Sequence, residues 1–123
     1  MAYKDFTEMP VWQTAFALLL NIYEVTKTYP TEEKYGLVSD MRRAANSVTN
    51  NISEGFGRYG RLDKTRFYKI SRGSCYELIN QSLASQALGF LSDNNMNELI
   101  NGYRDAISGL DSMIKSIETS PKK

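Results

Sequence analysis

The sequence contains no histidine and only one cysteine, Cys75, among its 123 residues. Without histidine, the chain lacks the commonest general base and the commonest protein ligand for transition metals. A single cysteine cannot close an internal disulfide, and it cannot complete a zinc site or a Cys–His nucleophilic pair. We therefore expect a protein that is not an enzyme and that binds no metal and no cofactor.

Long hydrophobic runs are also missing. The most apolar run, from Ala15 to Leu20, is too short to span a bilayer, and the first ten residues lack the apolar core of a signal peptide. Hydrophobic residues make up 41% of the chain and charged residues 24%, a balance typical of folded globular proteins rather than disordered ones. We expect one cytoplasmic domain, residues 1–123, that does not enter a membrane.

Proline occurs only at positions 10, 30 and 121, and none of the three interrupts an apolar pattern. Apolar residues recur with the i, i+3, i+4 spacing of helices, and no segment alternates with the period of two expected of a strand. The breaks divide the chain into predicted helices at about residues 10–28, 32–57, 63–88 and 92–119. Four amphipathic helices joined by short turns predict an all-α, up-down-up-down four-helix bundle.

Local signals support these boundaries and the buried faces. We expect Thr31, Asp63 and Ser92 to cap the second, third and fourth helices, and Gly89 to end the third. In the first helix, the predicted core stripe consists of Trp12, Ala15, Phe16, Leu19, Ile22 and Tyr23.

The stretch GFGRYG places Gly55, Gly57 and Gly60 in the pattern G-x-G-x-x-G, which binds dinucleotides in Rossmann domains. That motif requires a strand before the glycines and a helix starting within them, whereas here a predicted helix precedes them. The glycines fit the end of the second helix better. Gly55 would let two helices approach closely, and Gly57 and Gly60 would allow positive φ.

A helical wheel predicts polar side chains between the second and third helices. The predicted apolar face of the third helix (Phe67, Ile70, Ser74, Leu78) also contains Glu77 and Gln81. Because a buried carboxylate must be paired, we predict a polar seam in which Glu54 or Glu77 meets Arg43, Arg58 or Arg66. Two glutamates could instead indicate carboxylate catalysis, but the E-x-x-H ligands of di-iron bundles are absent. The predicted seam comprises Arg43, Asn51, Glu54, Arg66, Glu77 and Gln81.

The net charge of +1 conceals an uneven distribution, because residues 42–72 carry eight basic and two acidic groups. On the third-helix wheel, four cations lie within an arc of about 140°, with tyrosines among them. Cations with interleaved aromatic rings suit phosphate contact and base stacking, whereas the alternative is a solvated face balanced by acidic helices or a neighbouring subunit. The candidate nucleic-acid-binding residues are Arg58, Arg61, Lys64, Tyr68, Lys69 and Arg72.

The chain resembles the small, ribosomal-protein-like four-helix bundles encoded by intervening sequences within 23S ribosomal RNA genes. These are relatives of the accessory variability proteins of diversity-generating retroelements. The resemblance covers nearly the whole chain, and its most specific block runs from Arg42 to Arg58. The similar stretches are Phe6, Val11-Trp12-Gln13, Glu33-Lys34-Tyr35-Gly36-Leu37, Arg42-Arg43-Ala44-Ala45, Ser47-Val48, Asn51-Ile52, Glu54-Gly55-Phe56-Gly57-Arg58, Arg66-Phe67, Ile70, Gly73-Ser74, Glu77-Leu78 and Leu88-Gly89-Phe90-Leu91-Ser92.

This resemblance implies a left-handed four-helix bundle that assembles as a ring-shaped homopentamer without enzymatic activity. The retroelement branch is strongly basic, and it binds nucleic acid and a partner reverse transcriptase. The present chain departs from that branch in its pI of about 7.8. It also has Thr49 where many family members have proline, so a kink in the middle of the helix is not implied.

Two functional hypotheses follow, and a third is weaker. The chain is either a non-enzymatic accessory protein that binds RNA or DNA through the basic residues, or an oligomeric scaffold whose basic surface meets acidic helices of a neighbour. A carboxylate-based enzyme is disfavoured by the missing histidine and metal ligands.

Overall fold

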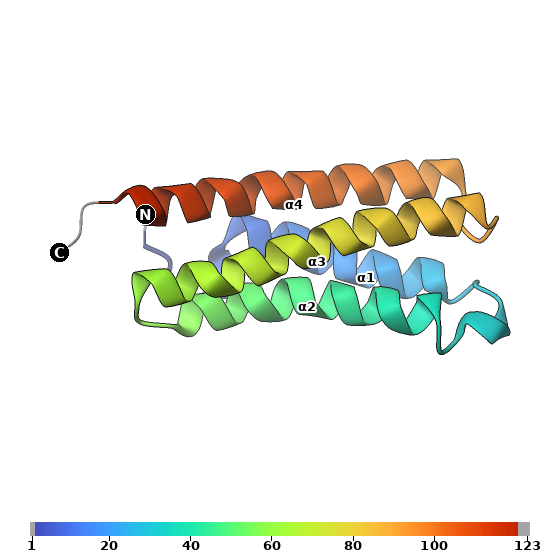
Figure 1. Ribbon diagram of the computed structural model, residues 1–123, viewed down its shortest axis with the longest axis horizontal. Helices are drawn as coiled ribbons and strands as arrows, with labels where there is room; N and C mark the ends of the chain where they lie inside the picture. The colour runs from blue at the N-terminus through green and yellow to red at the C-terminus, as the bar shows by residue number, and fades with distance from the viewer. Residues whose placement is uncertain (1, 121–123) are drawn as a thin grey trace.

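The computed structural model of the protein describes residues 2–120, and within these residues every regular element is helical. The long helices are α1 (Pro10–Thr26), α2 (Leu37–Gly57), α3 (Arg61–Ala87) and α4 (Asp93–Thr119), with short 3-10 helices η1 (Phe6–Glu8) and η2 (Thr31–Glu33). They run up and down alternately, so α1 and α3 begin at the end of the bundle where α2 and α4 finish (Figure 1). The predicted all-α four-helix bundle is confirmed.

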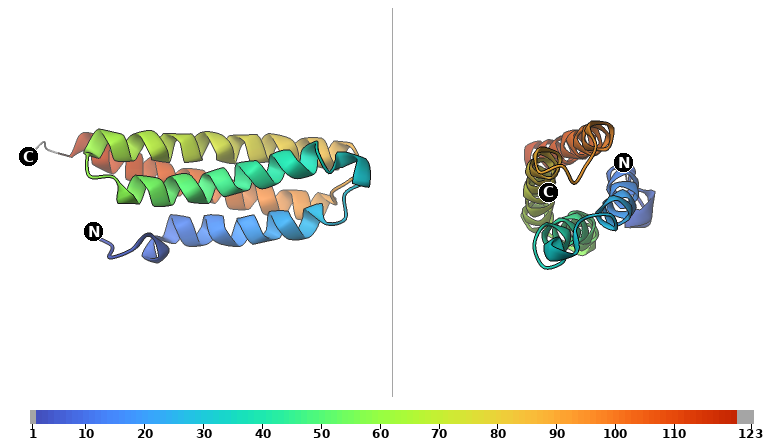
Figure 2. Two further views of the ribbon diagram at one scale, coloured as in Figure 1. Left: turned by 90° about the horizontal axis from the view of Figure 1, so that it is seen from below. Right: turned by 90° about the vertical axis from the view of Figure 1, so that its right-hand side faces the viewer.

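The helices surround one core, and the view along the bundle shows them around a common centre (Figure 2). α1 contacts α2 and α4, α3 also contacts α2 and α4, and α1 and α3 are therefore diagonal. The largest fully buried side chains are Tyr103, Ile22, Met41, Ile52, Leu78, Leu99 and Leu110.

The predicted helix ends are correct for α4 and need correction elsewhere. Ser92 caps α4, because its Oγ accepts a hydrogen bond from the backbone N of Asn95 at 3.1 Å. α2 begins at Leu37 rather than near residue 32, and the predicted cap Thr31 lies in η2. The side chain of Glu33 instead accepts a hydrogen bond from the backbone N of Leu37 at 3.1 Å.

The third helix also differs at its start. α3 begins at Arg61 after the extended residue Gly60, so Asp63 lies in the first turn and is not the cap. At the other end Gly89 has φ +84°, the left-handed conformation that commonly ends a helix. Gly57 and Gly60 do not have positive φ, so that prediction is wrong.

Gly55 lets α2 and α3 approach closely, as predicted. A Cβ added at this position would lie 2.6 Å from Cε1 of Tyr68 and 3.1 Å from the backbone O of Lys64. The tyrosine ring therefore occupies the space that any larger residue at position 55 would need. No such contact exists at Gly57, where a Cβ would meet nothing within 4 Å.

Small hydroxyl side chains also lie in the interface between α2 and α3. Ser71 donates a hydrogen bond through Oγ to the backbone O of Val48 at 2.8 Å, and the Oγ atoms of Ser74 and Ser47 are 2.8 Å apart. Serines and threonines fill much of the inner face of α3: Thr65, Ser71, Ser74, Ser82 and Ser85 are all buried. Short side chains that are hydrogen-bonded locally permit close packing, because little volume separates the two backbones.

The inner faces of α1 and α3 therefore differ from the predicted ones. In α1 the buried residues are Val11, Ala15, Leu18, Ile22 and Thr26, whereas the predicted core residues Phe16 and Tyr23 remain 39% and 38% exposed. In α3 the predicted core residue Ile70 is 44% exposed. The apolar spacing assigned some outward residues to the core, because each of these helices also has apolar residues that point outward.

The close approach at Gly55 predicts a difference between two glycines of the same helix. Gly55→Ala should destabilise the protein by about 1–3 kcal/mol, because the added methyl group must displace the packed ring of Tyr68. Gly57→Ala adds the same group in open space and should leave the stability unchanged or slightly higher. Urea unfolding of both variants measures this difference, and equal midpoints would contradict the account.

Candidate interaction surfaces

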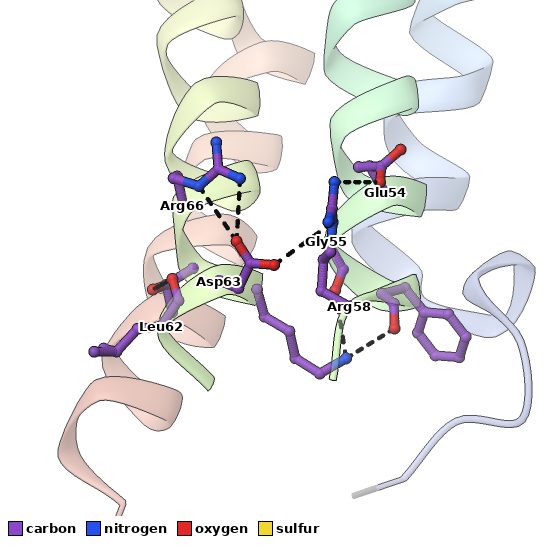
Figure 3. A network of polar contacts seen from close by, with 9 residues as sticks. Glu54, Gly55, Arg58, Leu62, Asp63 and Arg66 are labelled. Carbon is purple, nitrogen blue, oxygen red and sulfur yellow. Dashed lines mark hydrogen bonds and ion pairs between the residues drawn. The ribbon is translucent and has the colours of Figure 1, made fainter. Parts of the chain in front are cut away.

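The first predicted cation, Arg58, lies at the C-terminal end of α2. Its guanidinium pairs with Glu54 at 3.0 Å and with Asp63 at 3.6 Å, and Asp63 also pairs with Arg66 at 3.1 Å. Figure 3 shows this chain of ion pairs connecting the end of α2 to the start of α3. The guanidiniums of Arg58 and Arg66 also lie 4.6 and 4.2 Å from the ring centroid of Phe67. Arg58 therefore joins two helices.

This ion-pair chain is part of the predicted polar seam, but it lies at the surface. The side chain of Glu54 is 51% exposed, and Glu77 is also exposed and does not point inward as predicted. Arg43 pairs with Asp40 on the outside of α2. Inside the interface the polar groups are hydroxyls and one amide, because Asn51 donates to the backbone O of Ser47 at 2.8 Å. The buried part of the seam therefore contains no carboxylate.

Gln81 is half-buried, and its Oε1 is buried without a hydrogen-bond partner among the described residues. Asn51 and Gln81 are half-buried, whereas the prediction of inward-pointing glutamates is wrong, because Glu54 and Glu77 are both exposed. Glu54 pairs with Arg58 at the surface and Glu77 remains in solvent, so neither carboxylate loses its hydration.

The remaining candidate cations of α3 also have acceptors within the chain. Lys69 pairs with Glu118 at 2.6 Å, and Arg72 pairs with Asp111 at 2.5 Å, both across to α4. The hydrogen bond to Asp111 raises the pKa of Arg72. Arg61 donates to the backbone O of Ile117 at 3.2 Å.

Lys64 and Tyr68 lie toward the bundle interior rather than on the predicted basic surface. The Nζ of Lys64 donates to the backbone O of Phe56 at 2.8 Å and of Gly55 at 3.3 Å, and burial lowers the pKa of this amine. Tyr68 is only 3% exposed, and its ring packs on Gly55. The six candidate residues therefore do not form one continuous surface.

A shallow groove between α3 and α4 contains cations that the sequence reasoning missed. It is lined by Tyr76 from α3 and by Arg104, Ile107, Ser108, Asp111, Ser112 and Lys115 from α4. Arg104 and Lys115 have no ion-pair partner within residues 2–120. Residues 104, 108, 111 and 115 repeat at helical spacing along one face of α4, which was the available sequence signal.

The outer face of α1 is the second feature that the sequence reasoning missed. Only one of its 17 residues, Glu24, is charged, although the helix lies at the surface of the bundle. The rings of Trp12 and Phe16 stack at 4.7 Å, and Leu20 is 56% exposed. With Tyr23 they form an outward apolar stripe at positions i, i+4, i+8 and i+11, which we call the α1 outer stripe.

Two features bear on metal binding and on nucleophilic chemistry. Within residues 2–120 no three aspartate, glutamate or cysteine side chains are placed to hold a metal ion. Cys75 is fully buried, and this burial raises the pKa of its thiol to about 12. A thiol that stays protonated and inaccessible is a poor nucleophile. No helix in this part of the chain is sufficiently long and apolar to cross a membrane.

Comparison with known proteins supports the resemblance noted in the sequence. The family described as 23S rRNA-intervening sequence protein matches residues 7–112. A solved structure from Bacteroides thetaiotaomicron, described as a protein of unknown function from the S23 ribosomal protein family, is similar with a TM-score of 0.79. It is 18% identical, and the match covers 85% of this chain and 95% of that one. A search of curated proteins gives no match. The chain therefore belongs to the 23S rRNA-intervening sequence protein family.

Proposed function

We propose that this protein is a non-enzymatic scaffold that assembles with copies of itself through α1. The observation that carries this proposal is the α1 outer stripe, because a surface helix with one charge in 17 residues leaves the exposed side chains of Phe16 and Leu20 in water. Covering an exposed apolar side chain such as Leu20 with another protein removes its surface from water, which favours association.

The opposite side of the bundle supplies a matching surface on the next copy. The outer face of α3 carries exposed Leu62, Ile70 and Leu83, at 72%, 44% and 49% exposure. α1 and α3 are diagonal, so their outer faces point in different directions. A contact between unlike faces is heterologous, and it generates a ring when the rotation between copies closes and an open filament when it does not. We therefore propose the ring of five copies that the sequence resemblance implies.

Assembly through α1 predicts that one added charge separates the copies. Leu20→Lys should convert a particle five times the 14.0 kDa chain mass into monomers, because burying an unpaired ammonium is strongly unfavourable. The exposed Asn101 on α4 provides a matched control, and Asn101→Lys should leave the particle intact. Sedimentation velocity measures the masses, and circular dichroism verifies that both variants fold.

Two results would contradict this proposal. One is a wild-type protein that remains monomeric over the whole concentration range. The other is a Leu20→Lys variant that assembles as well as the wild type does. An oligomer with another number of copies would be consistent with assembly through α1 and would contradict only the proposed number of five.

Nucleic-acid binding is a second candidate function, and the groove between α3 and α4 favours it. Arg104 and Lys115 lie eleven residues apart on α4, about 16 Å along the helix, a length that several consecutive phosphates of one strand occupy. Tyr76 between them is 44% exposed, and the guanidinium of Arg72 lies 5.2 Å from its ring centroid. Exposed rings beside cations are the usual elements of single-strand binding.

The groove predicts which charge reversals weaken nucleic-acid binding. Arg104→Glu with Lys115→Glu should reduce affinity for single-stranded RNA or DNA and lower the salt slope by about 1.4, since each single-strand phosphate contact contributes roughly 0.7. The control reverses Lys4 and Lys34, which are exposed, have no ion-pair partner within residues 2–120 and do not line the groove. Fluorescence anisotropy over a salt series measures both effects.

If the wild-type protein binds neither single-stranded RNA nor single-stranded DNA at low salt, this second function is excluded. Reversing Lys69 or Arg72 is a poorer test, because each change would place a new carboxylate against Glu118 or Asp111 and disturb the fold.

A further inference from the structure

A cavity of about 520 Å³ lies at the end of the bundle where α1 and α3 begin. The N-terminal segment contributes Met9, α2 contributes Phe56, and α4 contributes Met113 and Ile117 to its apolar walls. Its size is within the range of small-molecule sites, which are mostly apolar with a few polar groups. None of the surfaces discussed above requires this cavity.

Among residues 2–120, one charged side chain lines the cavity, that of Lys64 in α3. Its ammonium donates to the backbone O atoms of Gly55 and Phe56, which leaves one of its three N–H donors available. No carboxylate lies within ion-pair distance of Lys64 in residues 2–120, in contrast to Lys69 in the next turn of the same helix. Lys64 is thus a partly buried cation without a counter-charge.

Hydroxyl groups accompany this cation. Tyr68 and Ser116 also line the cavity, and neither side-chain hydroxyl makes a hydrogen bond to a described residue. Tyr68 as a whole is only 3% exposed, but its phenol oxygen is not fully buried. Its oxygen therefore reaches the cavity or the solvent at the cavity mouth.

We propose that this cavity binds a small monocarboxylate with an apolar body, such as a medium-chain fatty acid. The carboxylate would accept hydrogen bonds from Lys64 Nζ and from the free hydroxyls, and the apolar body would contact Met9, Met113 and Ile117. A single negative charge matches the single cation, whereas a phosphate dianion would favour the several donors of an arginine cluster.

The test is titration calorimetry of the wild-type protein with decanoate, decanol and decylamine, which share one chain length and differ in charge. We expect saturable binding of one decanoate per chain, about tenfold or more tighter than decanol, and no binding of decylamine. Decanol that binds as tightly as decanoate would overturn the role of Lys64. No saturable binding of decanoate would overturn the site.

Two variants and one control locate the binding. Lys64→Met should remove the preference for decanoate over decanol, and Met113→Trp should block both by filling the cavity. Lys69→Met is the matched control, because Lys69 is an exposed lysine of the same helix that does not line the cavity. Unchanged decanoate affinity in Met113→Trp would place the ligand elsewhere and overturn the proposal.

Lys64 donates hydrogen bonds to two carbonyls at the end of α2, so Lys64→Met also lowers the stability of the protein. Methyl NMR spectra of the wild type keep the test independent of that variant. Decanoate should shift the Met9 and Met113 methyl signals and leave the signal of buried Met41 unchanged, and a uniform response of all three would contradict the assignment. This outcome does not depend on whether the protein assembles through α1.

Discussion

The close packing of α2 against α3 is the constraint on which the rest of the structure depends. The ring of Tyr68 lies against Gly55, and serine hydroxyls replace bulky side chains along the interface, so the two backbones approach closely. Five of the nine buried residues of α3 are serine or threonine, so its inner face buries less apolar surface than one made of aliphatic side chains would. Much of the apolar surface of α3 consequently faces outward, and the bundle offers apolar contacts on its outside.

The same packing explains where the charges act. Arg58 at the end of α2 pairs with Asp63 of α3, and Lys69 and Arg72 of α3 pair with carboxylates of α4. Lys64 donates to carbonyls at the end of α2, so these cations serve mainly as connections between helices. Exposed pairs of this kind add little stability individually. The cations of the groove on α4, by contrast, have no carboxylate partner in the described chain, and Lys64 at the cavity has none either. Whether a cation lacks a carboxylate partner therefore depends on its position in the fold rather than on the local density of basic residues.

The sequence predicted the architecture well because long apolar periods, Ser92 and Gly89 are strong local signals. It also predicted the close approach at Gly55. The prediction failed where two faces of one helix are apolar: Phe16 and Tyr23 were assigned to the core, and Ile70 was placed inside while Ser71 is buried. Periodicity cannot distinguish an apolar face that meets the core from one that meets solvent or a partner. The surface ion pairs, such as Arg72 with Asp111, join residues far apart in the sequence and could not be derived from spacing.

The central claim is that the apolar outside of α1 is covered by another copy of the chain. Amide hydrogen exchange of the unmodified protein at low and high concentration tests this claim directly, because a covered helix opens less often than an exposed one. The account predicts that protection across α1 rises with concentration while protection across α2 stays constant. Exchange in α1 that is the same at both concentrations, and as fast as in the most exposed segments, would contradict it.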